Sequence, residues 1–126
     1  MRGTIVLAAG VMLAAASPLA AQQGKECDDA RTQSDMNLCA TDRYQAADAE
    51  MNRAYAQLRA AIDAEERSAL LDAQRAWLRF RDAHCAFEAA GFRGGSMQPM
   101  IEAHCLAAVT RDRTKQLKDA LELADI

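Results

Sequence analysis

Residues 32–62 read TQSDMNLCATDRYQAADAEMNRAYAQLRAAI, and this stretch decides the fold class. Its apolar and small residues recur every three or four positions, which places them on one face of an α-helix. They are Met36, Ala40, Tyr44, Ala47, Met51, Ala54, Tyr55, Leu58 and Ile62. Thr32 can cap the helix while Asp35 sits in its first turn. The pattern therefore predicts a helix of about 30 residues.

A second helix is expected to begin after Asp63, which can cap it with Glu66 in the first turn. The helix runs to about Ala90, and Gly91 suits the left-handed conformation that ends a helix. The inward face of this helix is expected to carry Leu70, Ala73, Trp77, Phe80, His84 and Phe87.

A third helix follows the glycine-rich segment 91–95. Ser96 can cap it, Pro99 is tolerated in its first turn, and the apolar pattern continues to about Leu123. No stretch after residue 21 alternates as a strand would, and no repeat or interior linker divides the chain. Because the connections are short, we predict an all-α domain, a small antiparallel three-helix bundle.

Residues 1–21 have the layout of a cleavable secretory signal. Arg2 precedes an apolar run from Ile5 to Ala16, which would be roughly 18 Å long as a helix. A hydrocarbon core is about 30 Å thick, so this run is too short to remain as a span. The first cysteine, Cys27, lies beyond the expected cut after Ala21, which argues against lipid attachment. We expect a periplasmic or secreted domain over residues 22–126 with no stable membrane anchor.

The expected mature chain is acidic. Cleavage removes Arg2 and leaves 14 basic and 18 acidic residues, a formal charge of −4. This charge argues against nucleic acid and anionic membrane as partners and is compatible with a basic protein partner.

Four cysteines in a small exported domain predict two disulfides. Cys85 and Cys105 lie about ten residues on either side of the second turn, so antiparallel helices place them at the same height. Cys27 precedes the first helix and Cys39 lies in its second turn, so a bridge would fold the N-terminal segment back along that helix. We prefer these two pairs. Crossed pairings stay open, because the first helix starts near the end of the second.

The sequence gives little support for a metal site or a catalytic nucleophile. The doublets His84-Cys85 and His104-Cys105 suggest a metal site, but neighbouring helical residues point about 100° apart and no ligand spacing puts two on one face. Ser96 has no partner at a spacing typical of a nucleophile and its base. We therefore expect no metal, no cofactor and no catalytic residue.

Four polar residues are expected where the apolar faces of the first two helices meet. Asp48 and Asn52 lie beside Met51, and Gln74 and Arg81 lie along the second helix. We predict a structural polar network among Asp48, Asn52, Gln74 and Arg81, with a binding role as the alternative.

The ordered motifs of this chain resemble the LprI-type lysozyme-inhibitor family. They are Cys39, Asp48 to Asn52 with Tyr55, Gln74 to Trp77, Phe80 to Asp82, Cys85, Gly94-Gly95-Ser96, Cys105, Thr110, Arg113 and Leu117. The resemblance covers nearly the whole chain after residue 21. It implies a helical, disulfide-bonded bacterial envelope protein and names lysozyme inhibition as the activity of a member.

A lysozyme inhibitor must fill a cleft that binds polysaccharide beside catalytic carboxylates, and a protruding loop with a cation would suit it. Residues 91–100 form the best candidate, with the partner-binding loop itself at Phe92, Arg93, Gly94, Gly95 and Ser96. The alternative function is a non-enzymatic periplasmic adaptor or stress protein that binds another protein.

Overall fold

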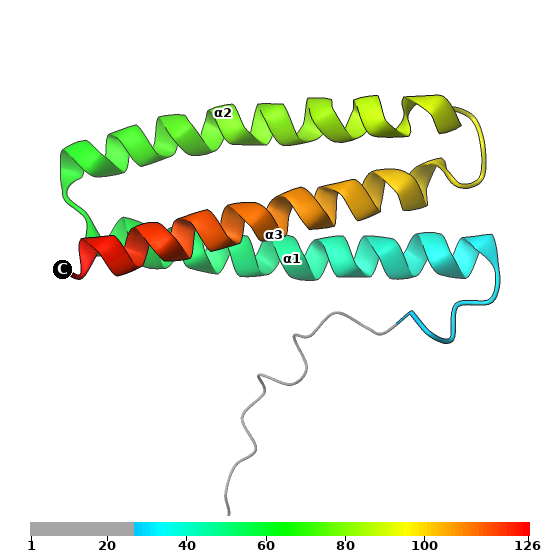
Figure 1. Ribbon diagram of the computed structural model, residues 1–126, viewed down its shortest axis with the longest axis horizontal. Helices are drawn as coiled ribbons and strands as arrows, with labels where there is room; N and C mark the ends of the chain where they lie inside the picture. The colour runs from blue at the N-terminus through cyan, green and yellow to red at the C-terminus, as the bar shows by residue number, and fades with distance from the viewer. Residues whose placement is uncertain (1–26) are drawn as a thin grey trace, which may run out of the picture.

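The computed structural model describes residues 27–126. Its helices are α1 (Gln33–Ala61), α2 (Ala64–Ala89) and α3 (Gln98–Ala124), with a 3-10 turn, η2 (Ala90–Phe92), after α2. The three long helices run side by side in alternating directions (Figure 1), and this part of the chain holds no strand. The predicted all-α three-helix fold is confirmed. The expected signal peptide and its cleavage site lie outside the described residues.

The first two helices begin where the sequence predicts, and both begin with a capping box. In α1 the Asp35 backbone N–H donates to Thr32 Oγ1 at 3.1 Å, and the Thr32 N–H donates back to the Asp35 carboxylate at 3.2 Å. Asp63 and Glu66 make the same exchange at the start of α2, at 2.9 and 3.0 Å. Each box satisfies backbone donors that the first turn of a helix leaves without partners.

The start of α3 differs from the prediction at two positions. Gly91 does not reverse the chain, because α2 tightens into η2 and the reversal comes later, at Gly94, whose φ is 77°. Ser96 does not cap α3. The N-cap is Met97, which makes no side-chain hydrogen bond, and the Ser96 carbonyl instead accepts from Asn37 Nδ2 at 3.0 Å.

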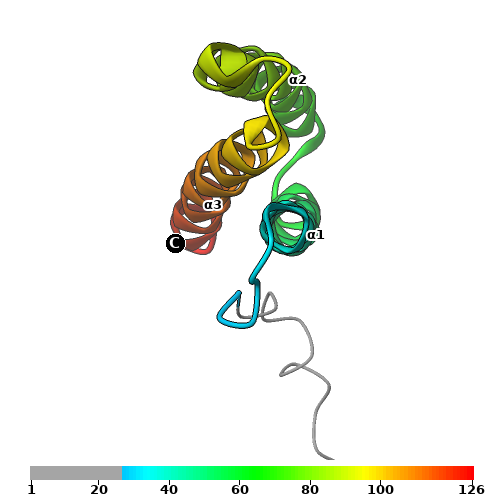
Figure 2. The same ribbon diagram turned by 90° about the vertical axis from the view of Figure 1, so that its right-hand side faces the viewer.

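The core is concentrated between α1 and α3. These two helices make the most extensive backbone packing, and α2 packs chiefly on α3 at the edge of the molecule (Figure 2). Small buried residues let α1 and α3 approach closely: Ala40, Ala47 and Ala54 on α1, and Ala103 and Ala107 on α3. A larger cluster of Met51, Leu58 and Leu117 fills the space toward the α1–α2 turn.

The expected inward face of α2 is correct for Leu70 and Trp77, which pack against the core, and wrong for three other positions. Phe80 is 58% exposed and Phe87 is 76% exposed, and Ala73 is exposed as well. The buried positions of α2 are instead Gln74, Arg81, Cys85 and Ala89. The rotation of α2 about its axis differs from the expected one because the Cys85 disulfide and the Arg81 ion pair both join α2 to its neighbours through the face that holds these two residues.

The preferred cysteine pairing is confirmed. Cys27 is bonded to Cys39, with their Cα atoms 5.8 Å apart, and Cys85 is bonded to Cys105, with their Cα atoms 5.5 Å apart. The first bridge holds the N-terminal segment against α1, and the second holds α2 to α3. Among residues 27–126, no helix is long and apolar enough to cross a membrane.

Candidate protein-binding site

The predicted partner-binding loop lies at one end of the molecule, between η2 and α3 (Figure 1). Its residues Phe92 to Ser96 are all exposed, and Phe92 keeps 41% of its surface in solvent. The same end of the molecule holds the start of α1. The structure therefore presents the loop, with the Arg93 cation, at a free tip of the bundle.

Hydrogen bonds brace this loop from both sides. The Gly95 N–H donates to the Phe92 carbonyl at 2.9 Å, and the Gly94 N–H donates to Gln98 Oε1 at 3.0 Å. From α1, Asn37 binds the Ser96 carbonyl, and Gln33 Nε2 in turn donates to Asn37 Oδ1 at 2.8 Å. Gly94 is the residue whose left-handed backbone makes the turn possible without strain. The loop is thus held in one shape before any partner arrives.

The second predicted group of residues lies between α1 and α2. Arg81 is only 7% exposed, and its guanidinium makes two ion pairs, to Asp48 at 3.1 Å and to Asp82 at 2.9 Å. Asn52 Nδ2 donates to the second oxygen of Asp48 at 3.3 Å. The structure therefore brings Asp48, Asn52 and Arg81 into one chain of hydrogen bonds that links the two helices.

Two aromatic rings flank the same guanidinium. The Arg81 Cζ atom lies 5.4 Å from the centroid of Tyr44 and 5.3 Å from that of Trp77, distances at which a cation is attracted to a ring face. Burial works to lower the pKa of Arg81, but the hydrogen bond to Asp82 and the neighbouring negative groups outweigh it and raise that pKa. Burial also raises the pKa of Tyr44. Arg81 is thus a permanent charge in a site built around it.

Gln74 lies apart from this chain of hydrogen bonds. It is 7% exposed, its Nε2 approaches Met51 Sδ at 3.5 Å, and its Oε1 accepts from Arg113 Nε at 3.0 Å. Arg113, to which the sequence motifs assigned no role, also has its Cζ atom 5.9 Å from the centroid of the Trp77 ring. Burial lowers the pKa of Arg113. Arg113 lies one helical turn before the core residue Leu117, and this spacing could have indicated that Arg113 faces α2.

Comparisons with known proteins identify a matching family. The sequence matches the family described as Lysozyme inhibitor LprI over residues 25–117. The chain belongs to this family. A protein of Rhizobium meliloti (strain 1021), described as uncharacterized, is 42% identical in an alignment that covers 94% of this chain and 95% of the relative. No solved structure matches.

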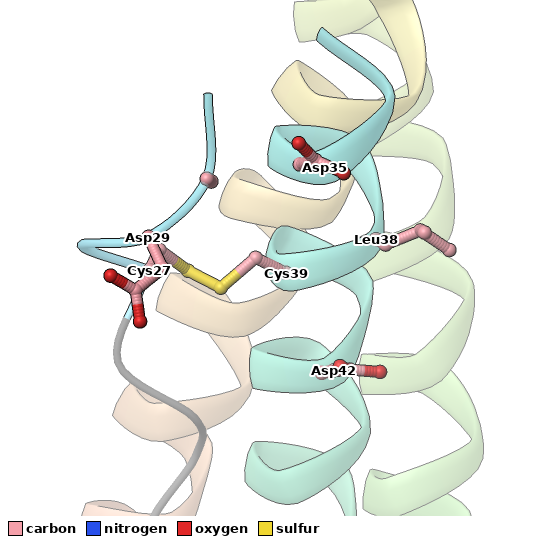
Figure 3. A pocket seen from close by; sticks show the side chains of 7 residues that line it. Cys27, Asp29, Asp35, Leu38, Cys39 and Asp42 are labelled. Atoms are coloured by element: carbon pink, nitrogen blue, oxygen red, sulfur yellow. A yellow bond between two sulfur atoms is a disulfide. The ribbon is translucent and has the colours of Figure 1, made fainter. Parts of the chain in front are cut away.

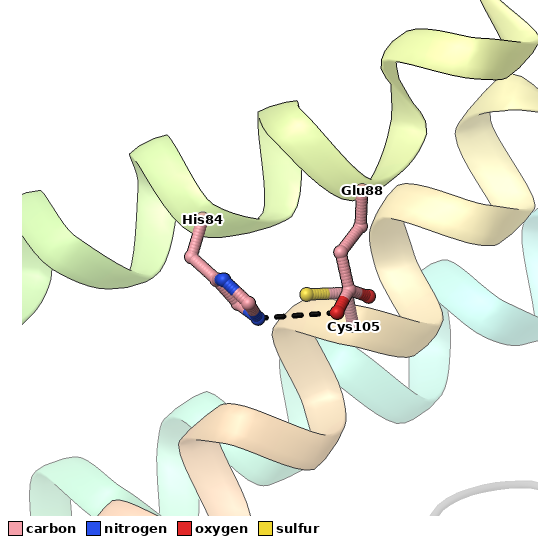
Figure 4. A group of neighbouring side chains, drawn as sticks. All are labelled: His84, Glu88 and Cys105. Carbon is pink, nitrogen blue, oxygen red and sulfur yellow. Dashed lines mark ion pairs between the residues drawn. The ribbon is translucent and has the colours of Figure 1, made fainter.

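One cluster in this LprI-family chain has the composition of a metal site. Ligand atoms of His84, Glu88 and Cys105 all lie within 4.8 Å of one another (Figure 4). The sulfur of Cys105 is bonded to Cys85, however, so it is no thiolate, and His84 Nε2 is directed to the Glu88 carboxylate at 3.1 Å. The donors therefore fit a polar side-chain contact beside a disulfide and fit a metal poorly.

A hollow of about 230 Å³ lies beside the first disulfide, where the N-terminal segment turns onto α1 (Figure 3). The carboxylates of Asp29, Asp35 and Asp42 line it together with Leu38. Asp35 belongs to the capping box of α1, where negative charge is favoured by the helix dipole. The hollow therefore adds to the acidic surface at the end of the molecule that carries the loop.

Proposed function

We propose that this protein is an exported envelope protein that binds and inhibits a lysozyme and performs no catalysis itself. The observation that carries the proposal is the match to the lysozyme-inhibitor family over residues 25–117, which takes in both disulfides, α1, α2 and most of α3. The whole disulfide-stapled bundle, rather than a short motif, supports it.

The braced loop is our candidate for the inhibitory contact. Glycosidases of this kind hold two carboxylates beside the scissile bond, and a guanidinium binds carboxylates strongly. Arg93 is exposed at the loop tip beside Phe92, so it can enter a cleft that excludes the bulk of the bundle. Because Asn37 and Gln98 already hold the loop, little ordering entropy is lost when a partner binds.

The acidic surface supports the same partner. With a formal charge of −4 over residues 22–126, the protein would attract a basic lysozyme and raise the rate of encounter. The carboxylates around Asp29 and Asp42 lie at the same end as the loop, so attraction would favour that end.

The deciding experiment mixes the purified, oxidised protein with c-type and g-type lysozymes and follows cell-wall lysis. We expect inhibition of at least one lysozyme at micromolar protein. Absence of inhibition across the panel at about 10 µM protein, with both disulfides verified by mass spectrometry, would reject the lysozyme proposal and favour the adaptor function.

A pair of variants tests the loop separately. Arg93→Ala should weaken inhibition at least tenfold, about 1.4 kcal/mol, while Arg75→Ala, an exposed arginine on α2, should not change it. Equal thermal stability of both variants would exclude misfolding as the cause. Full inhibition by Arg93→Ala would reject the loop as the contact while leaving lysozyme as the target.

A further inference from the structure

An apolar stripe runs along the solvent-facing side of α2. Its seven members recur at alternating intervals of four and three residues: Ala69, Ala73, Ala76, Phe80, Ala83, Phe87 and Ala90. This interval is the one by which the seam of one helix packs against another helix. All seven are exposed except Ala90, which is half-buried. The stripe is a second helix-packing face, separate from the one that α2 uses within the bundle.

The two phenylalanines make this face more than a scatter of exposed apolar atoms. Phe80 and Phe87 are 58% and 76% exposed, and the alanines between them extend the apolar surface without interruption. The Phe80 ring stacks on His84, with centroids 5.3 Å apart and planes within 13°. Soluble monomers seldom leave a contiguous apolar surface of this kind uncovered.

We propose that the stripe is a self-association site, at which α2 of one copy packs antiparallel on α2 of a second copy. Phe80 has Ala76 before it and Ala83 after it, so small residues next to each ring leave room for a large side chain from the other helix. The face is therefore complementary to itself. Figure 2 shows α2 at the outer edge of the molecule, where a second copy can approach it.

Charges beside the stripe select the antiparallel direction. Asp72 and Arg79 border the same edge of the stripe and are both exposed, two helical turns apart. An antiparallel copy brings each Arg79 to the other copy's Asp72, and in that alignment Phe80 falls among the alanines at 69, 73 and 76. A parallel copy in register would leave the two Arg79 side chains on opposite edges of the seam, where neither meets an Asp72, so no such ion pair forms.

The size of the face fits a reversible dimer. The stripe extends about 30 Å along the helix. Burying the exposed parts of the two phenylalanines would remove on the order of 250 Å² from water, and the alanines and bordering side chains bring the contribution of each copy to roughly 600 to 800 Å². Interfaces at this end of the range support weak dimers, so we expect a Kd on the order of 10 to 100 µM.

Sedimentation velocity of the oxidised chain over residues 22–126 tests the proposal. The dimer fraction should rise with concentration, and a Phe80→Glu/Phe87→Glu variant should stay monomeric. Leu123→Glu, which changes a residue 71% exposed on α3, is the matched control and should dimerise as the unchanged protein does. A protein that is monomeric up to about 500 µM, or a phenylalanine variant that still dimerises, would overturn the proposal.

Charge reversal tests the direction. Asp72→Arg and Arg79→Asp should each weaken the dimer several-fold, and the double variant should restore it. Failure of the double variant to restore it would reject the antiparallel arrangement. If the protein is monomeric and Phe80→Glu abolishes lysozyme inhibition, the stripe binds the lysozyme and a second copy is not its occupant.

Discussion

Arg81 is the residue on which the contact between α1 and α2 depends most. It is nearly buried, yet it carries a full charge that Asp48 and Asp82 neutralise and two aromatic rings flank. A buried charge is tolerated only when its hydrogen-bonding capacity is met. At this point along α2, the ion pairs and ring contacts of Arg81 hold the helix to α1, rather than the burial of apolar surface.

Removing one partner should expose that dependence. We expect Asp48→Ala to lower the free energy of unfolding by about 1 to 3 kcal/mol, because Asp82 alone then neutralises Arg81. Thermal unfolding followed by circular dichroism measures the loss, at about 4 to 8 °C per kcal/mol. Asn52→Ala, which removes a more exposed hydrogen bond to Asp48, should cost much less. An unchanged melting temperature in Asp48→Ala would contradict the structural role of this pair.

A second residue-scale prediction concerns two buried threonines on α3. Thr110 is fully buried, and its hydroxyl has no hydrogen-bond partner among residues 27–126. Thr110→Val should therefore leave stability unchanged or raise it by up to about 1 kcal/mol. The matched variant is Thr114→Val, which loses the bond from Thr114 Oγ1 to the Thr110 carbonyl at 3.1 Å and should be destabilised. Urea unfolding that shows equal losses would contradict the assignment.

At the scale of elements, α2 is the helix that depends most on a covalent link. α1 and α3 share the main core, while α2 packs chiefly on α3 and leaves its two phenylalanines exposed to solvent. The Cys85–Cys105 disulfide compensates by joining α2 to α3 across 20 residues of chain. A loop of this length contributes about 3 kcal/mol when it is closed.

The disulfides should therefore differ in what they protect. In a Cys85→Ala/Cys105→Ala variant we expect hydrogen exchange to speed up most in α2, with α1 and α3 affected less. The control, Cys27→Ala/Cys39→Ala, should increase exchange at the start of α1 and spare α2. Uniform loss of protection over all three helices in the first variant would show that α2 has no separate stability.

The polar link between α1 and α3 predicts a pH effect. The hydrogen bond from Lys118 Nζ to Glu50 at 2.7 Å lowers the pKa of Glu50. A carboxylate whose pKa is lower in the folded state stabilises the fold above its unfolded pKa and loses that effect as pH falls through the folded pKa. Glu50→Gln should lower Tm slightly near neutral pH, and the difference should shrink as pH falls below the unfolded pKa of a glutamate and through the lowered folded pKa. A constant difference across pH would contradict this origin.

At the scale of the whole molecule, the exposed loop and the acidic surface lie at the same end of the bundle. The braced loop and the acidic hollow lie where α1 begins and α2 ends, so a basic partner would be drawn toward the inhibitory contact that we propose. The α2 stripe lies along the side of the bundle, so self-association and lysozyme binding would use different surfaces.

The acidic surface leads to a prediction about the rates at which a lysozyme binds and dissociates. If the acidic surface steers a basic lysozyme, the association rate should fall at least several-fold between about 0.01 and 0.15 M salt, while the dissociation rate changes little. Surface plasmon resonance at several salt concentrations measures both rates. Salt dependence confined to the dissociation rate would contradict steering.

The sequence by itself determined the features that depend on neighbouring residues. Thr32 with Asp35 and Asp63 with Glu66 begin helices because each capping box closes within four residues. The sequence also favoured the Cys85–Cys105 pair, because antiparallel helices place residues equally far from a turn at the same height. The family resemblance was likewise readable from motifs in their order along the chain.

Only the tertiary structure decided which face of α2 is buried. Its sequence offers an apolar face with Phe80 and Phe87 as well as the one that holds Leu70, Trp77 and Cys85. The other face won because Cys85 reaches Cys105 and Arg81 reaches Asp48, contacts between residues that are far apart in the chain. The pairing of Gln74 with Arg113 arose in the same way. Local periodicity shows that a helix has a face to bury, whereas its rotation depends on the partners that the other helices present.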